Sequence, residues 1–78
     1  MDIFEIRLKE LRREKGKTQK ELANILGTTD DSIYSWEKGR SQPDIKMIRK
    51  LCIFFGVSAD YLLGLEDNVY TDVENNKY

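Results

Sequence analysis

The sequence predicts an all-α fold of five short helices, and two patterns indicate it. Apolar residues recur every three or four positions over most of residues 2–64, with charged or polar residues between them, as in amphipathic helices. Each of the five glycines stands at the end of one such segment, where helices commonly end. Alternation of apolar and polar residues is not sustained over even five positions, so no strand is predicted.

The chain has 78 residues, of which 40% are hydrophobic, so it is long enough for one small domain with a single core. We place this domain at residues 1–64. Residues 65–78 contain four acids, three asparagines and no helical stripe, which predicts an acidic, mobile tail. The alternative for this tail is that Val69, Tyr70 and Val73 pack against the domain.

The first predicted helix has the sequence IFEIRLKELRREK and starts at Ile3. Phe4, Leu8 and Leu11 repeat at spacings of four and three, and charged residues fill the gaps between them. Gly16 then ends the helix.

The second predicted helix starts at Thr18, because Thr18 and Glu21 are three residues apart and can form a capping box. Gly27 tolerates a left-handed conformation after the last turn, so the helix ends at about Leu26. Its predicted buried face comprises Leu22, Ala23 and Leu26.

The third predicted helix follows after only three residues. Thr29 can cap it by accepting a hydrogen bond from the amide of Asp31 or Ser32, and Ile33 and Trp36 form its buried stripe. The helix ends at Gly39. Two helices of about eight residues with so short a connection must cross at a steep angle.

Arg40, Ser41, Gln42 and Pro43 form a polar connection, after which Asp44 caps a fourth helix. Its predicted apolar face comprises Ile45, Ile48, Leu51, Cys52 and Phe55, and Gly56 ends it. Ser58 starts a fifth helix of about two turns that ends at Gly64. Leu62 and Leu63 are expected to reach the core.

The net charge is −1, but it is unevenly distributed. Residues 1–50 hold 12 Lys and Arg against 9 Asp and Glu, a balance of +3, whereas residues 51–78 hold 1 against 5, a balance of −4. Positive charge on the first half suits phosphate binding, and it suits an ordinary solvated surface nearly as well. For Arg7, Arg12 and Arg13 we favour solvation or ion pairing over a nucleic-acid patch.

The composition argues against several classes of protein. No stretch approaches the roughly 20 apolar residues of a membrane span, and acids stand where a secretory signal needs a basic end, so we expect a cytoplasmic protein. Histidine is absent, so Cys52 has no activating base and is expected to be a small core residue. We expect no enzymatic activity, metal, cofactor or small-molecule substrate.

The segments TQKELA, LGTT, SIYSWEKG, SQPD and FGVSADYLLG follow one another in this order. With this series, the span from about Phe4 to Gly64 resembles the Cro/repressor-type (XRE-type) helix-turn-helix transcriptional regulators of bacteria and phages. The resemblance implies a five-helix, lambda-repressor-like fold with a helix-turn-helix. It also implies that the second and third helices bind double-stranded DNA, usually as a homodimer on a two-fold operator.

The resemblance also implies a set of contact residues. The first turn of the third helix would face base edges in the major groove, which here means Asp30, Asp31, Tyr34 and Ser35. Gln19 matches a family glutamine that bonds a phosphate and braces the recognition helix. Further backbone contacts are expected from Thr18, Thr29, Lys38, Arg40 and Ser41, with less specific attraction from Lys17 and Lys20.

Two pairs of residues have expected roles other than a simple DNA contact. Arg12 and Glu37 match a partly buried structural ion pair of the family. Asp30 and Asp31 depart from the family pattern, in which glutamine, serine or basic residues are common at these positions. Carboxylates there would repel DNA phosphates. At least one of them is expected to stabilise the helix start, and cytosine recognition by the other is the minority interpretation.

Two functional hypotheses follow. The first is a sequence-specific, repressor-like DNA-binding transcriptional regulator, and the alternative is a helix-turn-helix protein-interaction module with weak or no specific DNA binding. Ile53 lies off the main stripe of the fourth helix, and Met47 and Phe54 are expected to be only partly covered. We therefore expect a homodimer through the fourth and fifth helices, with incidental exposure as the alternative.

Overall fold

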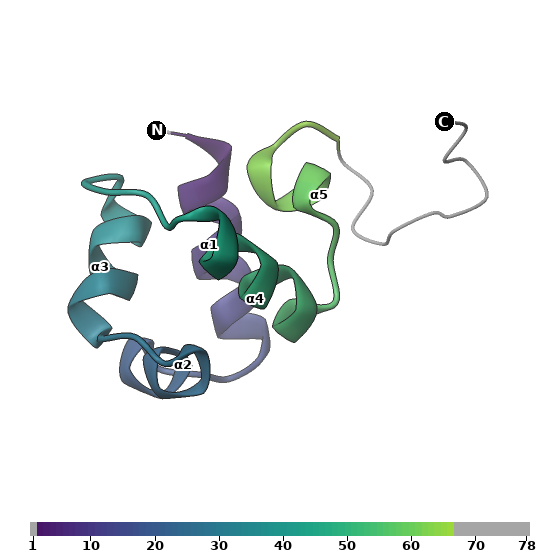
Figure 1. Cartoon of the computed structure of the whole chain (residues 1–78). Helices are drawn as coiled ribbons and strands as arrows, with labels where there is room; N and C mark the ends of the chain where they lie inside the picture. Colours follow the sequence, from purple (N-terminus) through teal and green to yellow (C-terminus); the bar gives the residue numbers. More distant parts are fainter. Residues whose placement is uncertain (1, 67–78) are drawn as a thin grey trace.

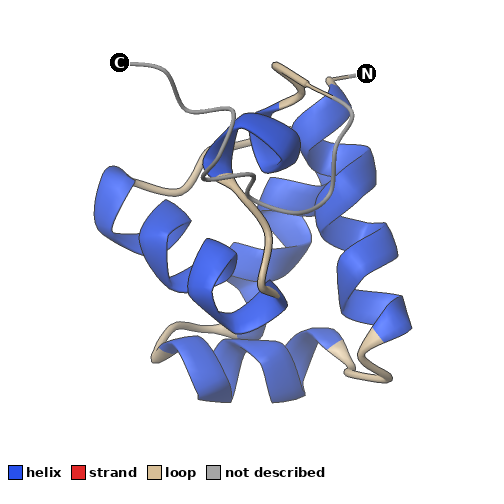
Figure 2. Cartoon of the chain, turned by 90° about the vertical axis from the view of Figure 1, so that its right-hand side faces the viewer, coloured by secondary structure: helices blue, strands red, loops and turns tan. Residues whose placement is uncertain are grey.

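The computed structural model describes residues 2–66, and these form five helices (Figure 1). The helices are α1 (Ile3–Glu14), α2 (Gln19–Leu26), α3 (Asp30–Lys38), α4 (Ile45–Phe55) and α5 (Ala59–Leu63). Helices and short connecting loops make up this whole described range, so the all-α, five-helix prediction is confirmed (Figure 2). Most of the predicted tail, with Val69, Tyr70 and Val73, lies outside the described residues. None of the described helices is long and apolar enough to cross a membrane.

The helices surround one core. α2 packs on α3, α1 packs on α3 and α5, and α4 packs on α2 and α5. In Figure 1, α3 lies on one side of α1 and α5 on the other. The five largest fully buried side chains come one from each helix: Leu8, Leu22, Ile33, Leu51 and Leu62. No helix can therefore leave the bundle without exposing a large apolar side chain to water.

Polar side chains define the helix starts, largely as predicted. The Thr18–Glu21 capping box is present, and Thr29 accepts from the Ser32 amide. Asp44 and Ser58 cap α4 and α5 in the same way. Each cap satisfies a backbone N–H that has no partner within its own helix. The predicted boundaries agree because these caps depend on neighbouring residues only.

Two predictions about the core are wrong. Ile45 was expected on the apolar face of α4, but 78% of its surface is exposed. It lies six residues before Leu51, which at 3.6 residues per turn places it about 120° away around the helix. Leu63 is 42% exposed, because it is one residue and about 100° away from the buried Leu62.

Candidate nucleic-acid interface

The start of α2 is held by reciprocal hydrogen bonds. Thr18 Oγ1 accepts from the Glu21 amide at 3.0 Å, and Glu21 Oε1 accepts from the Thr18 amide at 2.9 Å. These bonds from the Thr18 backbone and side chain hold the pKa of Glu21 below its usual value. Thr18 is exposed, and Gln19, the first residue of α2, is half-buried. The cap therefore fixes the position from which the Gln19 side chain extends.

The turn between α2 and α3 is equally well defined. α2 ends at Gly27, whose φ of 75° is a left-handed conformation that glycine adopts without steric cost. The exposed Thr29 then caps α3, with Oγ1 3.2 Å from the Ser32 amide and 3.0 Å from Ser32 Oγ. Lys50 of α4 donates to the carbonyl oxygen of Leu26 at 3.1 Å. A cation at this helix end also suits the helix dipole.

α3 has two sharply different faces. Ile33, Trp36 and Glu37 are buried, whereas Asp30, Asp31 and Tyr34 are exposed and Ser35 is half-buried. All four positions assigned to base contacts are thus at least partly accessible on one helix. Asp30 Oδ1 accepts from the Asp31 amide at 3.1 Å, so the Asp30 carboxylate supports the helix start. No such bond within residues 2–66 involves the Asp31 carboxylate.

Two cationic side chains lie near the aromatic ring of Tyr34. Lys38 Nζ lies 5.7 Å from the ring centroid, and Arg40 Cζ lies 5.5 Å from it. These distances fit cation–π attraction. Ser41 follows Arg40 and is exposed, as are Lys38 and Arg40 themselves. Residues predicted to contact bases and phosphates are therefore neighbours at the end of α3.

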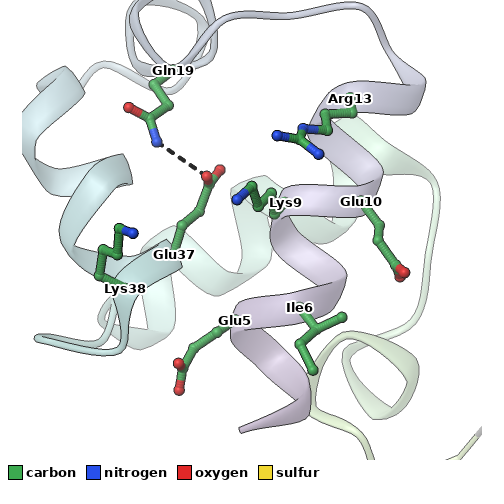
Figure 3. A pocket seen from close by; sticks show the side chains of 8 residues that line it. All are labelled: Glu5, Ile6, Lys9, Glu10, Arg13, Gln19, Glu37 and Lys38. Carbon is green, nitrogen blue, oxygen red and sulfur yellow. Dashed lines mark hydrogen bonds between the residues drawn. The ribbon is translucent and has the colours of Figure 1, made fainter. Parts of the chain in front are cut away.

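A buried ion pair holds α3 against α1. Arg12 Nε lies 2.6 Å from Glu37 Oε2, and Arg12 Nη2 lies 3.0 Å from Glu37 Oε1. Gln19 Nε2 donates to the same Oε1 at 3.1 Å (Figure 3). Arg12 Nη1 also donates to the carbonyl oxygen of Lys17 at 2.8 Å. One carboxylate on the buried face of α3 thereby links this helix to α1 and to the start of α2.

Lys17 and Lys20 lie beside this network. Lys17 is half-buried, while Lys20 is exposed on the first turn of α2. Neither side chain forms an ion pair within residues 2–66. Their positive charges therefore contribute to the electrostatic potential around the domain.

The described residues contain no group of three or more His, Cys, Asp or Glu that could hold a metal ion. Cys52 is only half-buried, and burial raises the pKa of its thiol. A raised pKa keeps the thiol protonated, which lowers its reactivity. The side chain packs against the core cluster, in keeping with the expected core role.

A family model described as a helix-turn-helix domain matches residues 6–68, which is most of the chain. The chain belongs to the Cro/repressor-type helix-turn-helix family of transcriptional regulators. In this helix-turn-helix protein, α2 and α3 form the pair for which the family is named, joined by the turn at Gly27.

Two curated relatives come from Bacillus subtilis. The SPbeta prophage-derived uncharacterized HTH-type transcriptional regulator YonR is 41% identical over 61 residues, covering 78% of this chain and 56% of the relative. The HTH-type transcriptional regulator ImmR is 39% identical over 61 residues, covering 78% of this chain and 48% of the relative. The helix-turn-helix chain thus spans about half the length of these relatives.

The fold also matches a solved structure. The P22 c2 repressor in complex with a synthetic operator superimposes with a TM-score of 0.77, covering 85% of this chain and all of the other. The identity is 23%, so the match shows a shared fold. The expected lambda-repressor-like architecture of the helix-turn-helix protein is confirmed.

Sequence reasoning missed one contact entirely. Arg7, which we expected to be solvated or ion-paired, donates to the carbonyl oxygens of Tyr61 and Glu66. Its guanidinium also stacks on Tyr61, with Cζ 4.0 Å from the ring centroid. Arg7 therefore ties α1 to α5. The partner carbonyls are 54 and 59 residues away, so no local pattern could have indicated them.

Proposed function

We propose that this helix-turn-helix protein is a sequence-specific, repressor-like DNA-binding transcriptional regulator that inserts the first turn of α3 into the major groove. The observation that carries the proposal is the two-faced character of α3. One face is locked by Ile33, Trp36 and the Arg12–Glu37 pair, while the opposite face offers accessible polar side chains. A rigid helix with an exposed first turn is what base recognition in a groove requires.

Each candidate contact has a role in this proposal. Base edges are read by donor and acceptor groups on the first two turns of α3, which belong to Asp30, Asp31, Tyr34 and Ser35. Hydroxyl, amide and cationic groups bind phosphates and set the register, from Thr18, Gln19, Thr29, Lys38, Arg40 and Ser41. Lys17 and Lys20 add sequence-independent attraction. Gln19 serves twice, because its amide nitrogen carries two hydrogens and Glu37 accepts only one.

We also propose that the regulator acts in the cytoplasm as a homodimer formed through α4 and α5. Ile53 is 79% exposed and Ile45 is 78% exposed on the outer side of α4. They lie eight residues apart, so they share one side of the helix. Met47 and Phe54 are partly buried against the core and border this surface. A monomer gains nothing from such exposure, whereas a two-fold interface would cover it.

A second candidate function is a protein-interaction module without enzymatic activity or specific DNA binding. Asp30 and Asp31 favour it, because two exposed carboxylates at the start of α3 repel phosphates and suit a basic partner protein. In that case α3 would face another protein, and the candidate phosphate contacts would be ordinary surface residues.

Selection from random duplexes, followed by salt titration, distinguishes the two functions. For the regulator we expect one enriched motif, and an affinity that falls with a log–log salt slope of about −3 or steeper per subunit, since four cations line the interface. Absence of enrichment together with a flat salt dependence would contradict DNA binding and support the interaction module.

A further inference from the structure

One basic cluster near the ion pair has no assigned role. A cavity of about 240 Å³ lies between α1 and the ends of α2 and α3. Its lining includes two residues proposed to contact phosphates, Gln19 and Lys38, together with Lys9 and Arg13 of α1. The cavity is far larger than the roughly 15 Å³ that one water needs, so a partly hydrated phosphate group fits.

Lys9 and Arg13 are directed into this cavity. They are four residues apart and therefore lie on the same side of α1. Figure 3 shows both cationic ends pointing toward the Gln19–Glu37 bond. Both residues are exposed, and neither makes a hydrogen bond or ion pair within residues 2–66. Two cations thus converge on one place, and neither forms an ion pair with an acid among residues 2–66.

The acids that line the cavity do not cancel this charge. Glu37 is already neutralised by two bonds from Arg12. The Glu10 carboxylate points away from the Gln19–Glu37 bond (Figure 3). The Glu5 carboxylate accepts a hydrogen bond from the Asp2 amide. It also lies close against Gly39, because a Cβ added to Gly39 would be only 2.5 Å from Glu5 Oε1. The end of the cavity near Gln19 is therefore electropositive.

Gln19 adds a neutral donor to the same place. One N–H of its amide is used by Glu37, which leaves a second N–H on Nε2. A lysine, an arginine and an amide N–H together match the acceptor oxygens of a phosphodiester.

We propose that Lys9, Arg13 and Gln19 form a phosphate site on α1 and α2 that holds one backbone phosphate of a bound duplex. This rests on the proposed function and extends the protein–DNA contact from the helix-turn-helix to α1. Because the contact is to a phosphate, it strengthens binding to all sequences equally and carries no base preference.

The test compares three proteins by fluorescence anisotropy on a selected duplex and on a random duplex, across a salt titration. They are the parent, the Lys9→Gln/Arg13→Gln double variant, and a Lys15→Gln control. Lys15 directly follows α1 and is also exposed, but its Nζ lies 5.7 Å from the Phe54 ring centroid and so faces α4. Thermal melting checks that all three are folded.

We expect the double variant to bind both duplexes about fivefold to tenfold more weakly at 0.1 M salt, with a salt slope smaller by about one unit. The control should match the parent, and the charge-preserving Lys9→Arg/Arg13→Lys variant should keep the parent slope. On duplexes in which single phosphates are replaced by neutral methylphosphonates, one position should weaken the parent but not the double variant.

The following results would contradict the proposed phosphate site. Equal slopes for the parent and the double variant, or a loss confined to the selected duplex, would reject it while DNA binding by α3 stands. If the double variant fails to fold, a methylphosphonate scan that affects the parent and the charge-preserving variant at different positions would reject it. Failure of the parent to bind any duplex with salt dependence would instead overturn the proposed function itself.

Discussion

At the scale of single residues, the two aspartates at the start of α3 are the least expected feature of the proposed DNA-binding surface. Their electrostatic effects oppose one another. A carboxylate in the first turn of a helix is stabilised by the positive end of the helix dipole, yet it is repelled by phosphates nearby. The structure separates the two residues, because Asp30 bonds the Asp31 amide. The Asp31 carboxylate accepts no hydrogen bond within residues 2–66.

Replacing Asp30 by Asn should therefore tighten binding to every duplex alike, since repulsion falls and base recognition is unchanged. Affinity for selected and random duplexes across a salt titration measures this. Tightening on one sequence only would contradict it.

Asp31→Asn is the matched comparison. If the Asp31 carboxylate accepts from a cytosine amino group, its loss weakens the selected site by about 1–3 kcal/mol and leaves random DNA unaffected or better bound. Arg40→Ala supplies the opposite control, because loss of a phosphate contact should weaken all sequences together and reduce the salt slope by about one unit.

At the scale of secondary-structure elements, the Arg12–Glu37 pair determines how α3 is presented. Side-chain exposure is 11% for Arg12 and 3% for Glu37, so the pair is nearly dry. Removing one partner from such a pair leaves an uncompensated charge, which costs far more than an exposed pair contributes.

Glu37→Leu should therefore lower the free energy of unfolding by roughly 3–5 kcal/mol, because the Arg12 guanidinium stays buried without its partner. The Arg12→Met/Glu37→Leu double variant should recover much of this loss, since two apolar side chains of similar size avoid the desolvation cost. Urea denaturation of both variants measures the difference. A single variant within 1 kcal/mol of the parent would show that the pair is solvated.

The elements also show what sequence can and cannot predict. Thr18, Thr29, Asp44 and Ser58 cap the helices as predicted, because caps depend on residues within one turn. The assignment of Ile45 and Leu63 to the core is wrong, because they lie about 120° and 100° around their helices from the buried Leu51 and Leu62. The same distinction applies to the candidate site. The exposed face of α3 could be predicted from its buried stripe, whereas the cavity between α1, α2 and α3 could not be predicted, because it depends on how the three helices pack.

At the scale of the whole molecule, the proposed dimer makes α4 the element to alter. Ile53→Lys should convert a dimer to a monomer in analytical ultracentrifugation without changing the melting of the domain, because the side chain is 79% exposed. A parent that is monomeric at high concentration, both free and on a duplex with two half-sites, would contradict the dimer.

The central claim is that the first turn of α3 enters the major groove, and methylation interference on the selected duplex tests it most directly. Dimethyl sulfate methylates guanine N7, which lies in the major groove, and adenine N3, which lies in the minor groove. We predict that methylated guanines block binding at two places about one helical turn apart, 10–10.5 base pairs between centres. Methylated adenines at those places should have little effect. Interference from adenines alone, or from neither base, would contradict the claim that α3 reads the major groove.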